Sequence, residues 1–538
     1  MTGKGGGLLL TRVGIWLIAG GLFIAPLVMV VSLALGGNHW QQLVDDGLWE
    51  ATTNSLVSSL VSAVLAVVVA TALALVLDRT DIPGAGVLRL FALSPLLIPP
   101  FVGAIAWSGL FGPNVGVNAW FDGPLWNIYG GDGVIFLLTL HSYPLAYLIV
   151  ATALRGLPAD LEHAARISGA SPLTTLRDVT LPLIRPALLS AFTLTVVANL
   201  GDFGIPAIIG TPERYYTLAT MVYRYLQSGT VEAPLQVVST LGVVLLALGV
   251  AAVIADRWVA SRHRVQVDAV SAPEALRLGV WRAPVAVLTW GAALAVTVGP
   301  LWALFTRALL PAPGIPFRLD TITMSNIVSA VTSTSVRTGL SNSLTLSLSA
   351  AAITLVLGLV IGVLTTRVRS FDNTALTVSA LLPLAVPGLI IAVGWLIVGR
   401  YTGTFNTLWV ILGAYVTAFT AMVVQAVRAP LVSTSVSLEE AARVSGAGPL
   451  RSIADTTARM AVPAAATGAL LVLVTAVREL TLSVILVAPG TTTLGVEIFN
   501  LQQAGNYNRA SALSLMFAIV GIAALAMSVG RLSGRRST

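Results

Sequence analysis

Long apolar runs alternate with short polar segments along the whole chain. A helix that crosses a bilayer needs about 20 mostly apolar residues, and twelve runs of about that length can be traced. They lie near residues 13–35, 53–77, 88–111, 134–154, 187–210, 235–255, 283–306, 342–366, 374–398, 408–427, 462–488 and 510–530. The pattern predicts an all-α integral membrane protein with about twelve transmembrane helices.

The composition agrees with this interpretation. Hydrophobic residues make up 56% of the 538 positions and charged residues 10%, and the mean hydropathy is +0.89, which no water-soluble surface could accommodate. The run 13–35 is too long for the core of a typical signal peptide and is followed by no convincing cleavage site, so we expect a first span there. The absence of cysteine excludes disulfides and Cys-based metal sites. The four histidines show no metal-ligand spacing, and we predict no metal and no cofactor.

The distribution of positive charge predicts the orientation. Lysine and arginine resist translocation, and with a cytoplasmic N-terminus about 22 of the 30 basic residues fall on the cytoplasmic side. An even number of spans returns the C-terminus to the same side. We therefore expect a multi-pass membrane protein with both termini in the cytoplasm. The charges are spread over many loops, which argues against nucleic-acid binding.

The chain is a tandem repeat. Asn54-Ser55-Leu56 recurs 288 residues later as Asn342-Ser343-Leu344, and the segment 161–173 recurs 277 residues later at 438–450 with ten of thirteen positions identical. Six spans per repeat give both copies the same orientation, with a pathway between them. We expect two parallel six-helix repeats at 1–255 and 283–538, joined by a cytoplasmic linker at 256–282.

Prolines recur within the third and ninth runs. Pro95 and Pro99 correspond to Pro383 and Pro387 at the offset of 288. Proline removes a backbone hydrogen bond, so both runs are predicted to be kinked. Such kinks could shape a gate, although proline is also common in membrane helices without such a role.

The segments 161–173 and 438–450 each predict a short amphipathic helix between the fourth and fifth spans of their repeat. Leu161, Ala164 and Ala165 recur at helical spacing and form one compact apolar face. Gly169 and Gly446 are expected to end the two helices. A surface helix presented once per half implies a partner with two equivalent grooves.

In these segments the chain resembles the binding-protein-dependent ABC importer permeases, whose EAA loop reads Glu-Ala-Ala, three residues, then Gly. The second copy matches at Glu440-Ala441-Ala442 with Gly446, whereas the first has His163 at the Glu position. The resemblance implies the type I ABC importer permease fold in the bacterial cytoplasmic membrane, two copies of a separate ATP-binding subunit and an extracytoplasmic solute-binding protein. The residues that it assigns to coupling with the ATPase are Glu162, His163, Ala164, Ala165, Gly169, Glu439, Glu440, Ala441, Ala442 and Gly446.

Ionisable residues interrupt the fifth and eleventh runs. Asp202 and Glu479 are equivalent at the offset of 277, and Arg478 precedes Glu479. Carboxylates are costly in a bilayer and usually face a partner or an aqueous cavity, so these three residues are predicted to line or gate the translocation pathway. A salt bridge that only braces the two halves is the alternative. The surrounding residues resemble the fused permeases of ferric-iron importers, with thiamine, polyamine and aminophosphonate permeases as relatives, and the one net negative charge of the three groups favours ferric iron or another small cation.

The sequence argues against ATP hydrolysis by this chain and against two other classes of membrane protein. The only lysine, Lys4, does not lie in a P-loop pattern, so ATP hydrolysis is expected in partner subunits and this chain is not expected to be an enzyme. A secondary transporter of the major facilitator type also has six plus six parallel spans, but of its Gly- and Arg-rich loop only Asp78-Arg79 is present in the segment 78–84. A membrane sensor without transport explains neither the paired loops nor the acidic spans.

Overall fold

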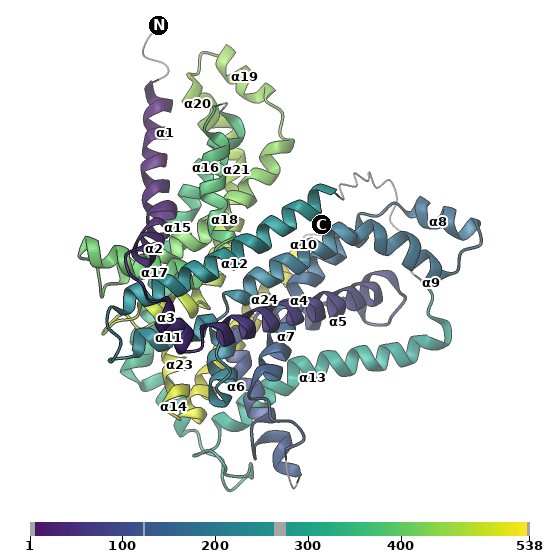
Figure 1. Cartoon of the computed structure of the whole chain (residues 1–538). Helices are drawn as coiled ribbons and strands as arrows, with labels where there is room; N and C mark the ends of the chain where they lie inside the picture. The colour runs from purple at the N-terminus through teal and green to yellow at the C-terminus, as the bar shows by residue number, and fades with distance from the viewer. Residues whose placement is uncertain (1–5, 122–123, 263–275, 369, 535–538) are drawn as a thin grey trace. The chain divides into compact units, whose positions relative to one another are not determined.

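The computed structural model describes residues 6–121, 124–262, 276–368 and 370–534 (Figure 1). Within these ranges the chain is helical, and its β structure is one isolated bridge between Thr80 and Leu276. Among the described residues, nine helices are long and apolar enough to cross a membrane, and two sharply bent helix pairs raise the number to eleven. The last predicted run, 510–530, lies within the C-terminal helix α24. The predicted all-α membrane fold is confirmed.

The helices of the first half of the chain are, in chain order, α1 (Gly6–Ala19), η1 (Gly20–Ile24), α2 (Ala25–Leu35), α3 (Trp40–Asp45), α4 (Leu48–Arg79), α5 (Ala85–Leu93), η2 (Ser94–Leu96), α6 (Pro100–Phe111), η3 (Gly116–Trp120), α7 (Gly131–Arg155), α8 (Ala159–Ile167), α9 (Pro172–Thr175), η4 (Leu176–Thr180), α10 (Leu181–Leu200), η5 (Pro206–Gly210), η6 (Thr211–Glu213), α11 (Leu218–Gln227) and α12 (Pro234–Arg262).

Those of the second half are η7 (Gly279–Trp281), α13 (Arg282–Ala308), α14 (Ser325–Thr332), α15 (Thr334–Arg367), α16 (Asn373–Leu381), η8 (Leu382–Leu384), α17 (Gly388–Thr402), α18 (Leu408–Ser433), α19 (Ser437–Val444), α20 (Pro449–Ile453), η9 (Ala454–Ala458), α21 (Arg459–Val477), α22 (Thr481–Leu486), α23 (Leu494–Gln503) and α24 (Tyr507–Gly534). Of the predicted linker at 256–282, residues 263–275 lie outside the described residues.

The chain divides into two compact units, and each draws on both repeats. Unit 1 comprises residues 1–46, 222–249 and 333–497, and unit 2 comprises residues 47–221, 250–332 and 498–538. Unit 1 therefore joins the central helices of the second repeat to the first span of the first repeat. Unit 2 joins the central helices of the first repeat to α13, the first span of the second repeat. The boundaries near 255 and 283 describe the sequence repeat, whereas the compact units cut across them.

The core of unit 1 is a bundle of α15, α18 and α21. Glycine permits the closest approach in this bundle, because a Cβ on Gly358 of α15 would lie 2.5 Å from the Cβ of Val423 on α18. The first span packs on the same unit: a Cβ on Gly394 of α17 would lie 2.7 Å from the backbone oxygen of Pro26 in α2. Small residues thus set which helices of unit 1 touch.

The core of unit 2 is the corresponding bundle of α4, α7 and α10. A buried polar network crosses it: the Asn199 amide donates to the Ser62 hydroxyl at 2.8 Å and accepts from the Ser142 hydroxyl at 2.7 Å. In an apolar core such groups must find partners. One residue from each helix supplies them, which fixes the end of α10 against its neighbours.

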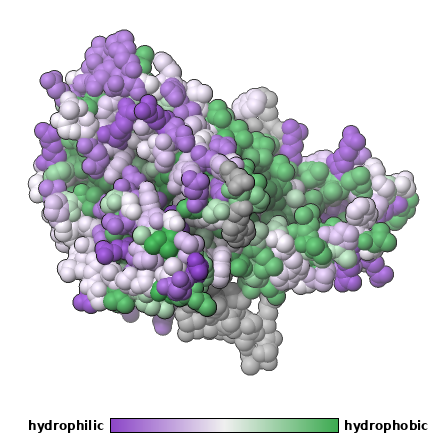
Figure 2. All heavy atoms as spheres, turned by 90° about the horizontal axis from the view of Figure 1, so that it is seen from below, coloured by the Kyte–Doolittle hydropathy of each residue, from purple (hydrophilic) through white to green (hydrophobic). Residues whose placement is uncertain are grey.

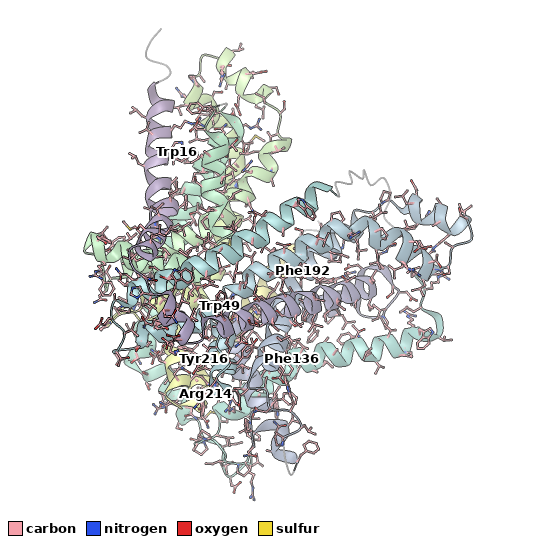
Figure 3. All side chains as sticks on the ribbon, viewed as in Figure 1. Trp16, Trp49, Phe136, Phe192, Arg214 and Tyr216 are labelled. Carbon is pink, nitrogen blue, oxygen red and sulfur yellow. The ribbon has the colours of Figure 1, made fainter. Side chains whose placement is uncertain are left out.

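A tryptophan in the first span of each repeat holds the loop that precedes the third span of the other repeat. Trp16 (Figure 3) donates to Asp372 at 2.6 Å, and Arg12 donates to the same carboxylate at 3.0 Å. In unit 2, Trp290 donates to the Pro83 carbonyl at 3.3 Å. Trp290 follows Trp16 by the same 274 positions that separate Pro300 from Pro26. Each compact unit thus contains the first span of one repeat and the central helices of the other, an arrangement that we call the exchange of first spans. In both units a tryptophan of the first span donates a hydrogen bond to the corresponding loop.

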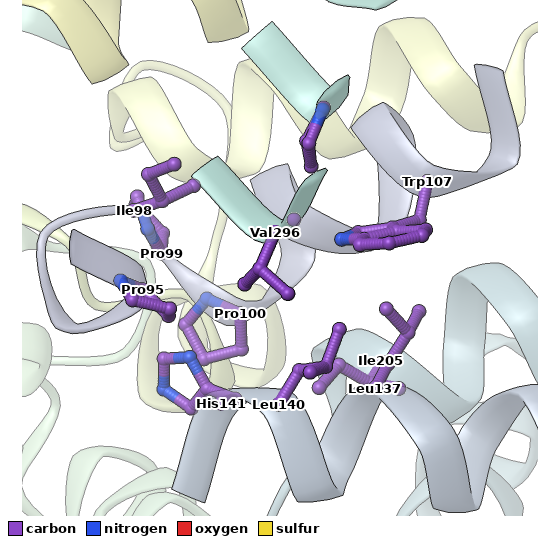
Figure 4. A pocket seen from close by; sticks show the side chains of 12 residues that line it. Pro95, Ile98, Pro99, Pro100, Trp107, Leu137, Leu140, His141, Ile205 and Val296 are labelled. Carbon is purple, nitrogen blue, oxygen red and sulfur yellow. The ribbon is translucent and has the colours of Figure 1, made fainter. Parts of the chain in front are cut away.

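The prolines of the third and ninth runs do more than kink a helix. The segments Ala85–Leu96 and Pro100–Ala119 meet at 101°, and Asn373–Leu384 and Gly388–Thr402 meet at 106°. Pro99 and Pro387, at the two breaks, have extended ψ angles of 145° and 133°. Each predicted span is therefore a broken pair of short helices. Figure 4 shows the first break, where Pro95, Pro99 and Pro100 line a cavity of about 40 Å³ with His141 and Val296.

Replacing Asp372 by Asn tests the hydrogen bonds that Trp16 and Arg12 donate to the loop before α16. Hydrogen bonds from Ser370, Trp16 and Arg12 hold the pKa of the Asp372 carboxyl well below its usual range. A lowered folded-state pKa contributes stability that is fully present above the unfolded value of about 4 and is lost as the pH falls through the folded value. D372N should therefore lower the thermal unfolding midpoint at neutral pH, and the difference should shrink in acid. D320N is the control because the Asp320 side chain is 71% exposed. Equal unfolding midpoints for wild type and D372N at neutral pH would contradict a stabilising role for the Asp372 hydrogen bonds.

Candidate functional site

Both repeated loops contain the short helix that the sequence predicts. They are α8 in unit 2 and α19 in unit 1, each followed by a second short helix, α9 or α20 (Figure 1). Gly169 and Gly446 end the two helices with φ angles of +89° and +90°. The following residue donates back to the helix in both loops, Ala170 to Ala165 and Ala447 to Ala442, each at 3.0 Å. The two loops thus end in the same left-handed C-cap, which glycine favours.

A buried carboxylate anchors the first loop. Glu162 is 7% exposed, forms an ion pair with Arg79 at the end of α4 and accepts a hydrogen bond from the Thr180 hydroxyl at 2.7 Å. A buried carboxylate needs both a counter-ion and donors to offset its lost hydration. Arg79 and Thr180 supply them, so α8 is attached to the end of α4 and to η4.

The second loop repeats this anchor. Glu439 is 3% exposed, lies 3.7 Å from Nε of Arg367 at the end of α15 and accepts a hydrogen bond from Thr457. Thr457 follows Thr180 by the loop offset of 277, and Arg367 follows Arg79 by the span offset of 288. Our sequence reasoning missed these two arginines and two threonines, although both repeat offsets pointed to them.

The other predicted coupling residues lie outside the anchor. His163, Ala164 and Gly169 are exposed in the first loop, as are Glu440, Ala441 and Gly446 in the second, and Ala165 and Ala442 are half-buried. Glu440, which occupies the Glu position of the EAA pattern, is therefore free of the buried cluster that its neighbour Glu439 forms.

The large apolar side chains of the two loops point outward. Ile167 is 88% exposed and Val444, its equivalent, is 89% exposed. Leu173 is 74% exposed and its equivalent Leu450 is 41% exposed. Of the apolar face that we predicted in the first loop, Ala165 is half-buried, whereas Ala164 is exposed and Leu161 is 43% exposed. Exposed apolar side chains in equivalent positions of both loops are typical of a protein contact.

The fifth and eleventh runs were predicted as continuous spans, and this is wrong. Helix α10 ends at Leu200 and α21 ends at Val477, ten or more residues before the predicted ends. The chain leaves the helical conformation and then begins another short helix. In unit 2 the carboxylate of Asp202 accepts from the Ile205 amide at 2.9 Å, and in unit 1 that of Glu479 accepts from the Leu482 amide at 2.7 Å.

The carboxylates of Asp202 and Glu479 therefore have the same local role, that of a helix cap. Each accepts from the amide three residues later and satisfies a donor at the start of the new helix. Both side chains are half-buried, as is Arg478, which is the C-cap of α21. Asp202 belongs to unit 2, and Arg478 and Glu479 belong to unit 1. Among the described residues no group of three or more His, Asp or Glu side chains could hold a metal ion.

Comparison with known proteins matches both halves of the chain. The family model described as "Binding-protein-dependent transport system inner membrane component" matches residues 70–265 and 355–536. Each match contains one repeated loop and one of the carboxylates at the break. The match to this family stands against the alternative of a major-facilitator transporter.

Individual relatives are permeases. The chain is 26% identical over 403 residues to a "Probable ABC transporter permease protein y4fN" of Sinorhizobium fredii, covering 70% of this chain and 68% of that protein. It is 25% identical over 450 residues to the "Fe(3+)-transport system permease protein FbpB 2" of Haemophilus influenzae, covering 83% of each. A third relative, a "Probable molybdenum ABC transporter permease protein" of Haloferax volcanii, is 30% identical and matches 41% of this chain and 80% of its own length.

The repeat that the sequence revealed thus coincides with a double match to one family of membrane transport subunits. The matched ranges cover more than half of the chain and hold the two loops with the same anchor and the two breaks with the same cap. The chain therefore belongs to the binding-protein-dependent transport system inner membrane components, the permeases of ABC importers.

Proposed function

We propose that this permease forms the translocation pathway of its importer and receives two copies of a separate ATP-binding subunit at the loops 159–175 and 437–453. An extracytoplasmic binding protein delivers the cargo. The observation that carries the proposal is the pair of anchored helices, each presenting an apolar side chain almost fully to the outside at the same position. The loops and both termini lie in the cytoplasm in this proposal, since positive charge accumulates there.

The anchors make the loops suitable for transmitting force. Because Glu162 is paired to the end of α4 and Glu439 to the end of α15, a displacement of either loop is passed directly to a long spanning helix. A loop held only by exposed contacts would move without its span. The buried pairs therefore support a role in coupling rather than in simple attachment.

The proposed cargo is ferric iron or another small cationic solute. The relative that this chain matches over 83% of both lengths is named for Fe(3+) transport. Asp202, Glu479 and Arg478 bring one net negative charge to the breaks of the two units. A negative pathway favours a cation over an oxyanion.

Replacing the outward apolar residues tests the contact with the ATPase. I167D and V444D should each reduce the amount of ATPase that copurifies by about tenfold or more, since burial of such a side chain is worth about 1.5–3 kcal/mol and 1.4 kcal/mol is tenfold in affinity. L319D is the matched control, because Leu319 is 91% exposed but lies between α13 and α14. Recovery of the cytoplasmic ATPase would also test the orientation. An undiminished amount of copurified ATPase with the I167D V444D double variant would contradict the proposal.

The adjacent residues Glu439 and Glu440 allow the anchoring of the second loop to be tested separately from its contact with the ATPase. E439Q removes the counter-ion of Arg367 and should destabilise the second loop by about 3–5 kcal/mol, as for other broken buried pairs, so that less folded permease is recovered from membranes. E440Q changes an exposed side chain and should leave the amount of permease unchanged while weakening ATPase recruitment. The two quantities are read on the same preparation by size-exclusion chromatography. Identical behaviour of the two variants would contradict the division of roles.

The carboxylates at the breaks can be tested with variants that keep or lose the cap. Asparagine caps a helix about as well as aspartate, so D202N, and by analogy E479Q, should retain normal protein abundance, whereas D202A and E479A should lower it. A pathway role predicts that D202N and E479Q impair ferric-iron uptake per molecule, with molybdate uptake negligible throughout. Normal uptake by both isosteric variants would leave the carboxylates with the capping role alone.

A further inference from the structure

Unit 2 contains a cavity at the end of α13 that is remote from the repeated loop. Its volume is about 530 Å³, and its walls include Leu110, Val117, Trp302, Thr306, Arg307 and Asn508. Arg282, at the other end of α13, contacts Asp81 in the loop that follows Arg79. At 1.5 Å per residue, Arg307 lies about 38 Å farther along the helix. The cavity therefore lies at the opposite end of α13 from the loop 159–175 of the same unit, and its volume suits a small organic group.

Arg307 brings an uncompensated positive charge to this cavity. Its Nη1 atom is buried without a hydrogen-bond partner, and no carboxylate among the described residues lies within 4.0 Å of its guanidinium. The guanidinium lies 5.7 Å from the centre of the Tyr507 ring, and a Cβ on Gly109 would lie 3.2 Å from Nη1. Packing thus fixes the side chain. Because arginine stays charged in proteins, a buried donor of this kind calls for an anion.

A neutral polar group accompanies the charge. Asn508 is 5% exposed, and its Oδ1 atom is buried without a partner, while its Nδ2 atom donates to the Leu310 carbonyl at 2.6 Å. The lining of the cavity therefore includes both a cationic donor and a neutral acceptor. An anion that also carries a hydroxyl group would satisfy both.

The surroundings of the cavity favour a lipid over a soluble anion. One face of α13 is exposed along its whole length, at Val287, Leu294, Val298, Trp302 and Phe305, and Figure 2 shows apolar surface over the part of unit 2 that carries this helix. Trp302 belongs to this face and also lines the cavity. Its ring lies 5.7 Å from that of Phe305 and 6.1 Å from that of Phe317, an aromatic cluster typical of the membrane interface.

We propose that this cavity binds the phosphate group of an anionic phospholipid from the leaflet opposite the loop 159–175, with the phosphate on Arg307, a headgroup hydroxyl on Asn508 and the acyl chains along the exposed face of α13. The shared chemistry is that of a phosphodiester anion next to an apolar surface. Phosphatidylglycerol, whose headgroup supplies both the charge and the hydroxyls, is the appropriate probe.

Native mass spectrometry of the purified permease tests the proposal. After exchange into mixed micelles of phosphatidylglycerol and phosphatidylcholine, wild type should retain phosphatidylglycerol selectively, and R307Q should reduce this retention at least several-fold. R400Q is the matched control, since Arg400 is an exposed arginine near the end of another helix. R307K should retain an intermediate amount. A312W, at an exposed position of the cavity wall, should block retention without altering the packed core, so the test does not depend on the folding of R307Q.

Several outcomes would overturn the proposal. These are equal retention of both lipids, unchanged retention in R307Q and A312W, or displacement of the lipid by inorganic phosphate at equal concentration, which would assign the cavity to a soluble anion. Unchanged lipid retention in R307Q with weaker affinity for the purified binding protein would assign it to protein docking.

Discussion

Inside a membrane, every polar group that the helix does not satisfy must find a partner within the protein, and this constraint organises the structure. It is most visible where spans are interrupted. At the breaks after α10 and α21, Asp202 and Glu479 satisfy the amides that begin the next helix. At the ends of α4 and α15, Arg79 and Arg367 find Glu162 and Glu439. Asp202 and Glu479, which are costly in an apolar run, thus supply the hydrogen-bond acceptors that allow the backbone to break and start a new helix.

The same constraint links the interior to the surface. Because Glu162 and Glu439 are buried in ion pairs, the helices that carry them are held in one orientation, with Ile167 and Val444 turned outward. An apolar side chain that is nine-tenths exposed gains nothing in the isolated chain. Its presence in both loops, on the same fixed support, is understandable if a second protein covers it.

Duplication also explains the exchange of first spans. Each unit contains the first span of the other repeat, and Trp16 and Trp290 hold equivalent loops in the two units. The exchange ties each unit to both halves of the chain. Such connections add contacts of long sequence separation, which slow folding.

The membrane environment, the position of most spans, the tandem repeat, the two surface helices and the glycines that end them could all be predicted from the sequence. These features are local: they follow from apolar run length, from helical period and from the backbone freedom of glycine. The same reasoning failed where a contact between distant segments decides. It treated 187–210 and 462–488 as continuous, because an apolar run does not reveal that a carboxylate within it can cap a new helix. The division of the chain at 1–255, 256–282 and 283–538 follows the repeat and stays a prediction. Two similar repeats offer a first span two equivalent places to pack, and in the folded protein the small residues and the tryptophan hydrogen bonds, which connect segments hundreds of residues apart, select one of them.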